Sequence, residues 1–155
     1  MPETGQTPVR CLVVPLQGGR SLLLPNAAVA EVVPYRAPEN PDPQAPWRLG
    51  SVDWRGQQLQ VLAFETLCGD PFARPGRGAQ LVVLNAIGAQ AGTGYYALAA
   101  SAIPHLLVVA AETLQEGAAP GDGAATPVLL EARVDDRPVS IPDLEALEAR
   151  LQETA

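Results

Sequence analysis

Short apolar runs alternate along the chain with clusters of glycine, proline and polar residues. Residues 11–16 are apolar, residues 17–20 (Gln-Gly-Gly-Arg) suit a tight turn, and residues 21–24 are apolar again. Two such runs around a short glycine-containing turn are typical of a β-hairpin. The pattern therefore predicts paired strands near the start of the chain.

A second hairpin is predicted in the middle of the first half. Residues 51–54 and 57–64 are strand-like, and only Arg55 and Gly56 separate them. A short hairpin turn needs positive φ, which glycine adopts without steric cost. We therefore expect a rigid Arg-Gly corner at the tip of this hairpin.

The second half of the chain predicts further strands. The continuous apolar run "QLVVLNAI" is typical of a buried strand. Glycine-rich and alanine-rich stretches, such as residues 117–126, are predicted to be loops. The expected strands are residues 80–87, 95–100, 106–110, 128–134 and 138–141, and the last two form a hairpin that turns on Asp135 and Asp136.

Two early segments depart from the strand pattern. The stretch "NAAVAEVV" predicts one or two helical turns with Asn26 as N-cap, before a strand resumes at Val32. Residues 36–47 contain four prolines, which excludes a helix or a central strand. This segment is predicted to be an extended surface loop.

The end of the chain predicts one amphipathic helix at about residues 142–152. Pro142 and Asp143 suit its first turn. Leucines recur on one face, which we expect to pack across an open barrel end, and polar residues face away. The leucines are Leu144, Leu147 and Leu151, and the residues expected to face solvent are Glu145, Glu148 and Gln152.

About nine short strands and one terminal helix indicate an all-β fold, either barrels or a sandwich. A chain of 155 residues is long enough for one domain, or for two small barrels that share a core. We expect a single domain over residues 1–155, with a flexible N-terminal tail of about residues 1–8.

Charge excludes several classes of function. The formal net charge is -7, and all ten cations are arginine. So acidic a chain is a poor candidate for binding nucleic acid or an anionic membrane, and without lysine it has no phosphate-loop lysine. The apolar run at residues 11–16 is too short for a signal peptide, and residues 97–111 are too interrupted for membrane insertion. We expect a cytoplasmic protein.

Catalytic and metal-binding residues are not found in a usable pattern. His105 is the only histidine, and no serine lies in a Gly-x-Ser-x-Gly elbow. Cys11 and Cys68 lack the spacing of a metal site, so neither a metal nor a cofactor is expected. They are read as free thiols in a reducing compartment, with a disulfide as the alternative.

The Arg-Gly corner allows two interpretations. Arg55 either points into water from an ordinary turn, or it presents a bidentate donor on a rigid scaffold. An arginine beside a tryptophan, here Trp54, is typical of an interface hot spot. The residues alone leave both interpretations open.

Most of the chain, from Val9 to Leu151, resembles the CheW-like adaptor family of bacterial chemosensory systems. The stretches that carry the resemblance are "LVVPLQGGRSLLLP", "VAEVVPY", "WRLGSVDWRGQQLQVLAF", "LVVL" and "RPVSIPDLEAL". The stretch "LLLPNAAVAEVVPY" is also similar to CheW-like proteins of the chemosensory systems that control type IV pili and twitching motility.

The resemblance implies two intertwined, five-stranded, SH3-like barrels with a shared core and a C-terminal helix. It implies a non-enzymatic scaffold that links the cytoplasmic tip of a methyl-accepting chemoreceptor to the regulatory domain of a CheA-type histidine kinase. The receptor helix is expected in the groove between the barrels, and the kinase's homologous barrel at a barrel end. The implied receptor-binding residues are Val29, Glu31, Gly50 and Arg55, together with Trp54 and Gly56 of the same corner.

Some positions depart from the family pattern. Trp54 stands where leucine is usual, Gln60 replaces a common proline, and Ala63 replaces a common acid. These departures bear on the identity of the partner more than on the fold. A barrel that binds an unrelated partner, and a small hydrolase that uses His105, are the alternative functions.

Overall fold

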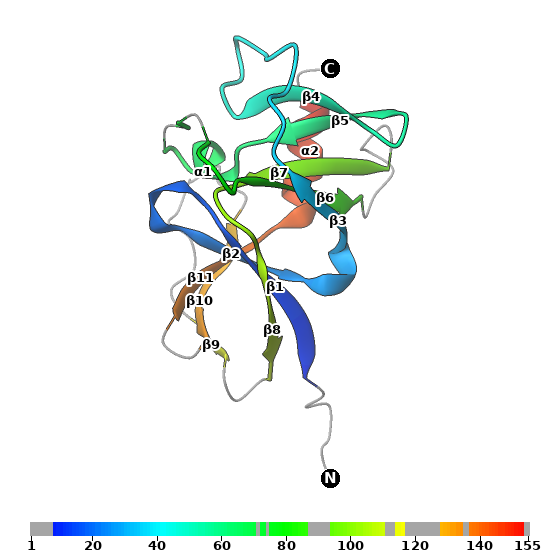
Figure 1. Cartoon of the computed structure of the whole chain (residues 1–155). Helices are drawn as coiled ribbons and strands as arrows, with labels where there is room; N and C mark the ends of the chain where they lie inside the picture. The colour runs from blue at the N-terminus through cyan, green and yellow to red at the C-terminus, as the bar shows by residue number, and fades with distance from the viewer. Residues whose placement is uncertain are drawn as a thin grey trace.

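A computed structural model describes residues 8–70, 72–73, 75–86, 94–110, 114–116, 128–134 and 137–153. These residues form eleven strands in two sheets, with two short α-helices and two 3-10 turns. Figure 1 shows one sheet above the other, with the C-terminal helix against the upper one. The prediction of an all-β fold is therefore confirmed, with two more strands than expected.

The lower sheet of Figure 1, here called the first barrel, has the strand order β8-β1-β2-β11-β10-β9. The predicted hairpin is present, because β1 and β2 pair antiparallel around the 3-10 turn Gln17–Gly19. The sheet has six strands instead of five, since the short β9 adds to one edge. Its strands are β1 Val9–Pro15, β2 Ser21–Pro25, β8 His105–Val109, β9 Leu114–Glu116, β10 Val128–Val134 and β11 Arg137–Pro142.

The upper sheet, here called the second barrel, has the order β3-β6-β7-β5-β4. Its central strands β6 and β7 are antiparallel, whereas β5 and β7 are parallel. The second predicted hairpin is β4 and β5. The strands are β3 Val29–Pro34, β4 Arg48–Trp54, β5 Gln57–Leu62, β6 Gln80–Asn85 and β7 Tyr95–Ala100.

The two sheets are interleaved along the chain. The first two strands belong to the first barrel, the next five form the whole second barrel, and the last four return to the first. Strand β1 therefore pairs with β2 on one side and with the distant β8 on the other. This order matches the predicted intertwining of two sheets.

Alternate residues of the central strands are buried in different cores. Leu81 and Val83 of β6 lie inside the second barrel, whereas their neighbours Val82 and Leu84 lie in a core shared with the first barrel. Because both faces of such a strand are buried, its sequence is continuously apolar, as in "LVVL". The shared core also contains Leu22 and Leu24 of β2 and Leu147 of the C-terminal helix.

The C-terminal helix α2, Leu144–Glu153, packs on the shared core. Asp143 is its N-cap, because its Oδ1 accepts the backbone N–H of Ala146 at 3.1 Å. The helix begins two residues later than predicted, since Pro142 still belongs to β11. It covers the core between the barrels instead of an open barrel end.

Glu148 of α2 is an exception to the predicted polar face, since it is only 2% exposed. Burial, together with the charge of Glu148, raises the pKa of Tyr96 in β7. The prediction that Glu148 faces solvent was wrong.

The proline-rich segment at residues 36–47 lies along the edge of β4. Glu39 and Ser51 exchange two backbone hydrogen bonds, of 2.9 and 2.8 Å. The segment ends in the core, because Trp47 is 7% exposed and the guanidinium groups of Arg48 and Arg150 lie 5.1 and 5.3 Å from its ring centroid. The prediction of a surface loop therefore fails at Trp47. We call residues 36–39 the edge strap.

Smaller differences concern the short helical turns. Asn26, predicted as an N-cap, is instead the first residue of a 3-10 turn, Asn26–Ala28, whose N-cap position is Pro25. The predicted strand end at Phe64 instead starts the helix α1, Phe64–Leu67. The predicted loop at residues 117–126 and the turn at residues 135–136 lie outside the described residues. In the described part of the chain, no helix is long and apolar enough to cross a bilayer.

Candidate functional site

The Arg-Gly corner is a two-residue turn between β4 and β5, since Trp54 pairs directly with Gln57. Both turn residues have positive φ, 50° at Arg55 and 79° at Gly56. Positive φ at both central residues is the property of a type I′ turn, which favours asparagine and glycine. Sequence reasoning foresaw this conformation for Gly56, but not for Arg55.

One carboxylate oxygen holds the corner together. Glu31 Oε1 accepts a hydrogen bond from Trp54 Nε1 at 2.9 Å and another from Arg55 Nη2 at 3.1 Å. The Arg55 guanidinium also lies over the Trp54 ring, 4.9 Å from its centroid. The Arg55 side chain remains 67% exposed. Three of the predicted binding residues therefore meet at one point.

This group also joins the two edges of the second barrel. Glu31 belongs to β3 and Trp54 to β4, the first and last strands in the sheet order. The contact between them closes the sheet through side chains. We call Glu31, Trp54 and Arg55 the clasp.

Trp54 differs from its predicted role. It is only 8% exposed and packs inside the second barrel, where its ring lies 4.9 Å from that of Tyr95 at 58°. A partner therefore cannot use the indole as an exposed hot-spot residue. Tyr95 was not among the predicted site residues, and its place beside Trp54 follows from the pairing of strands distant in sequence.

Val29 and Gly50 do not touch the clasp in any contact found among the described residues. Val29 is the first residue of the edge strand β3, is half-buried and packs on the shared core. Gly50 has φ 128°, and a Cβ there would lie 2.3 Å from the Glu39 carbonyl oxygen. Its role is therefore to let the edge strap approach β4.

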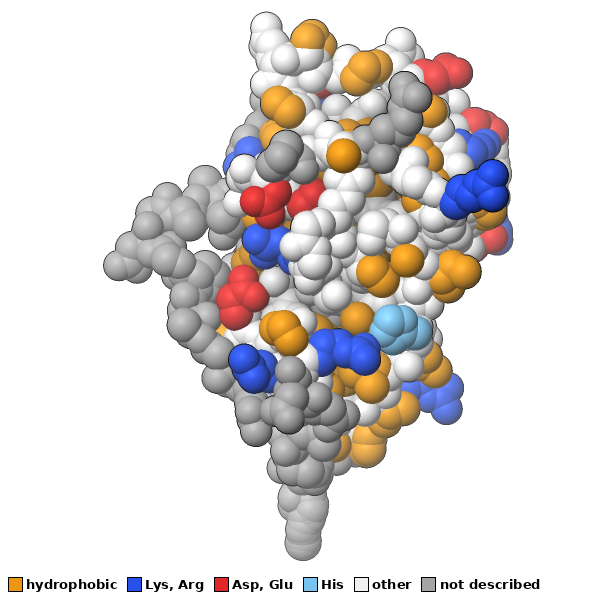
Figure 2. All heavy atoms as spheres, turned by 60° about the vertical axis from the view of Figure 1, so that its left-hand side comes forward, with side chains coloured by type: hydrophobic (Ala, Val, Ile, Leu, Met, Phe, Trp, Pro, Cys, Tyr) orange, Lys and Arg blue, Asp and Glu red, His pale blue; other side chains and the backbone are white. Residues whose placement is uncertain are grey.

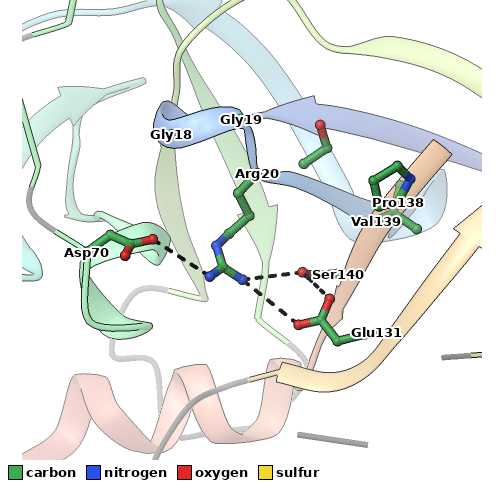
Figure 3. A pocket seen from close by; sticks show the side chains of 9 residues that line it. Gly18, Gly19, Arg20, Asp70, Glu131, Pro138, Val139 and Ser140 are labelled. Carbon is green, nitrogen blue, oxygen red and sulfur yellow. Dashed lines mark hydrogen bonds and ion pairs between the residues drawn. The ribbon is translucent and has the colours of Figure 1, made fainter. Parts of the chain in front are cut away.

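A polar pocket of about 330 Å³ lies on the seam between the barrels. Figure 3 shows Arg20 reaching across it, toward Asp70 on one side and toward Ser140 and Glu131 on the other. Its guanidinium lies 3.7 Å from Asp70 and 3.9 Å from Glu131, and it donates to Ser140 Oγ at 3.4 Å. Arg20 thus connects the segment after α1 with strands β10 and β11.

Further polar contacts reinforce the same seam. The Gln17 side chain donates to the Ala73 carbonyl at 2.7 Å and accepts the Ala73 N–H at 2.8 Å. The Glu65 Oε2 atom accepts the Gln17 backbone N–H at 3.0 Å. Glu65 is 1% exposed, and burial raises the pKa of its carboxyl group despite these hydrogen bonds. These contacts tie the β1–β2 turn to the helix α1.

A second surface lies on the first barrel. Val9, Leu106 and Val108 are each more than half exposed, and they belong to the neighbouring strands β1 and β8. Arg10 lies opposite Val108 in the register, and His105 of β8 accepts from Arg137 at 3.0 Å. Figure 2 shows hydrophobic side chains beside the single histidine on this part of the molecule. In the register Leu106 and Val108 lie opposite Leu12 and Arg10, whereas Val9 lies opposite the buried Val109 and therefore on the other side of the sheet. We call Leu106 and Val108, which share one side of the sheet, the apolar face.

The remaining candidate residues for catalysis or metal binding do not form a group with one another. His105 is exposed, and its described contact is with the Arg137 guanidinium. Cys11 and Cys68 are both free thiols, and burial raises the pKa of each. No cluster of three or more metal-ligating side chains occurs within the described ranges. The clasp and the apolar face are therefore the surfaces on which a function can be argued.

Comparisons with known proteins agree with the fold. The family model described as a CheW-like domain matches residues 10–152. The scaffolding protein TtCheW from Thermoanaerobacter tengcongensis has a similar solved structure, with a TM-score of 0.69 and 17% identity over 88% of this chain and 89% of that one. At this identity the likeness concerns the fold alone. No protein of curated function matches the sequence.

Proposed function

Since the chain belongs to the CheW-like domain family, we propose that it is a non-enzymatic scaffold that couples a chemoreceptor to a CheA-type histidine kinase. One surface binds the cytoplasmic tip of a methyl-accepting receptor, and another binds the regulatory domain of the kinase. The scaffold holds both in one array, so that a conformational change of the receptor biases the kinase. In this proposal the protein acts in the cytoplasm. The more specific proposal is that it belongs to the chemosensory system of a type IV pilus.

The receptor site in this proposal is the clasp together with Val29, which lies two residues before Glu31 in β3. The observation that carries it is the backbone of Arg55, which has φ 50° at a turn position where asparagine or glycine is favoured. A residue that breaks a local preference on a rigid turn is typical of a functional site. The guanidinium is held outward by the clasp and can donate to acceptors on a receptor helix.

The kinase site is proposed on the apolar face. A scaffold needs two separate surfaces, and this face belongs to the barrel that does not carry the clasp. Its exposed Leu106 and Val108 offer an apolar contact area, with Arg10 beside them. The homologous barrel of the kinase regulatory domain is the proposed occupant.

Arg55→Asn tests the receptor site. Asparagine suits the positive φ of the turn, so the variant keeps the hairpin but loses the guanidinium. We expect receptor pull-down to be lost while the thermal unfolding curve changes little. Arg55→Glu should also abolish receptor pull-down, but it places a second carboxylate next to Glu31. The exposed Arg77 provides a matched control as Arg77→Asn, and unchanged pull-down by Arg55→Asn would refute the assignment.

Leu106→Glu tests the kinase site. A charge on the apolar face should weaken binding of the purified kinase regulatory domain and leave receptor binding intact. Leu106 is 55% exposed, so the substitution leaves the core unchanged. Equal loss of both partners would indicate that the two surfaces are not separate.

A further inference from the structure

Trp54 is the buried member of the clasp at the proposed receptor site. A leucine at this position would have neither a side-chain hydrogen-bond donor nor an aromatic face. In this chain the indole uses both: its N–H reaches Glu31 and its ring lies under Arg55. The clasp therefore has two contacts that a leucine could not make.

Trp54 contacts Glu31 and Arg55 in two different ways. The Glu31 carboxylate receives the indole N–H and the guanidinium on the same oxygen, at 2.9 and 3.1 Å. The ring holds the guanidinium from below, 4.9 Å from the ring centroid. Without the indole, an exposed ion pair alone would hold Arg55, and such pairs fix a long side chain weakly.

The indole is itself held in place. Trp54 is 8% exposed, and Tyr95 of β7 packs against its ring at 4.9 Å. Tyr95 and Arg55 thus both contact the Trp54 ring. A rigid element next to a binding residue reduces the entropy lost when a partner is bound.

We propose that Trp54, supported by Tyr95, is the positioning residue that holds Arg55 and Glu31 in one outward arrangement before a partner arrives. The role of this arrangement in binding a partner rests on the proposed function, whereas the arrangement itself does not depend on it. It assigns Trp54 a role beneath the binding surface, where the sequence pattern predicted a direct contact. The partner contacts Arg55 and Glu31, and Trp54 determines the orientation of these two side chains.

The structural part is tested in the full chain without any partner, by the NMR signals of the arginine Nε–H groups. Ring currents displace protons that lie over an aromatic face, so the Arg55 signal should differ from that of the exposed Arg77. We expect this displacement to vanish in Trp54→Leu and to persist in part in Trp54→Phe, which keeps a ring but loses the N–H donor. The internal control is Arg48, which lies 5.1 Å from the Trp47 ring centroid and should not shift.

The functional part uses the purified cytoplasmic hairpin of the chemoreceptor encoded nearest to this chain. Trp54→Phe should lower its affinity about threefold and Trp54→Leu about tenfold, the range that one lost hydrogen bond and one lost cation–π contact allow. An Arg55 signal that is the same in the wild type and in Trp54→Leu would overturn the proposal, as would unchanged affinity of both variants. If the wild type does not bind the hairpin, the proposed function fails, whereas the NMR comparison still decides the positioning role.

Discussion

At the scale of single residues, Glu65 is a buried carboxylate on the seam between the barrels. Its Oε2 atom has a hydrogen bond from Gln17, but its Oε1 atom is buried with no hydrogen-bond partner among the described residues. Burial disfavours the ionised form and raises the pKa. The native state therefore binds a proton at a pH at which the unfolded chain has already released it.

This raised pKa predicts a pH-dependent loss of stability. A carboxyl group with a raised native pKa stabilises the fold below its unfolded value, about 4.3, and loses that contribution as pH rises through the native value. Glu65→Gln does not titrate, so the stability of the variant relative to the wild type should increase with pH over this interval. Urea unfolding at several pH values between about 4 and 8 measures the difference.

The exposed Glu145 of α2 provides the control for this experiment. Glu145→Gln removes a carboxylate of the same kind from the surface. Its stability relative to the wild type should stay nearly constant with pH. A constant difference for Glu65→Gln as well would contradict the role given to burial.

At the scale of elements, the edge strap and the cap of α2 are two local devices that the packing requires. The strap covers the exposed edge of β4, which would otherwise offer free backbone groups for pairing with another chain. The cap satisfies a backbone donor at the start of a helix that packs on both barrels. Each can be tested by one substitution.

Gly50→Ala should detach the strap. The new Cβ would lie 2.3 Å from the Glu39 carbonyl, and the φ of 128° is strained for alanine. We expect a loss of about 1–3 kcal/mol in the free energy of unfolding. Hydrogen exchange at Ser51, whose N–H bonds to Glu39, should become faster. Gly76→Ala, at a position with open space and without positive φ, is the matched control.

Asp143→Ala should destabilise the helix α2 by about 1 kcal/mol, because it removes the side-chain acceptor of the N-cap. Asp143→Asn keeps an acceptor and should lose much less. Thermal unfolding of the two variants provides the comparison. Equal destabilisation would mean that the carboxylate charge, and not the cap, supports the helix.

The elements that the sequence predicted well are those specified by local chemistry. The hairpin at Arg55 and Gly56 follows from turn residues between two strand-like runs. The C-terminal helix follows from its leucine stripe, although Asp143, expected in the first turn, is its N-cap. Trp47 and Glu148 were misplaced because their burial depends on contacts far along the chain. The Trp47 ring contacts Arg48 and also Arg150 of α2, about a hundred residues away.

The candidate site shows the same division. The pattern and the resemblance both singled out Arg55, and the resemblance alone singled out Glu31, which the structure brings within 3.1 Å of Arg55. Neither indicated that Trp54 is buried or that Tyr95 supports it, since this depends on the register of β7 in the sheet. Departures from the family pattern also became interpretable. Gln60 accepts a hydrogen bond from Arg48, and Ala63 is fully buried.

At the scale of the whole molecule, the shared core determines how the two barrels behave together. Leu22 of the first barrel, Leu84 of the second and Leu147 of α2 all belong to it. The seam contacts of Arg20 and Gln17 add polar links on the outside. We therefore expect the two barrels to unfold as one cooperative unit.

Leu147→Ala tests this cooperativity. Leu147 is fully buried, so the truncation should cost about 2–5 kcal/mol. Probes in either barrel should report the same lowered midpoint in a single transition. Leu106→Ala, at a position that is 55% exposed, should change the midpoint little. Separate transitions for the two barrels would show that the shared core does not couple them.

The interleaved order of strands also has a consequence for synthesis on the ribosome. Leu12 of β1 pairs with Leu106 of β8, so the first hairpin emerges long before its neighbour has been translated. The strands β3 to β7 follow one another and can assemble before β8 is synthesised. During this time the apolar surface of the first hairpin remains exposed. The nascent chain is thus vulnerable to aggregation until its last quarter has left the exit tunnel.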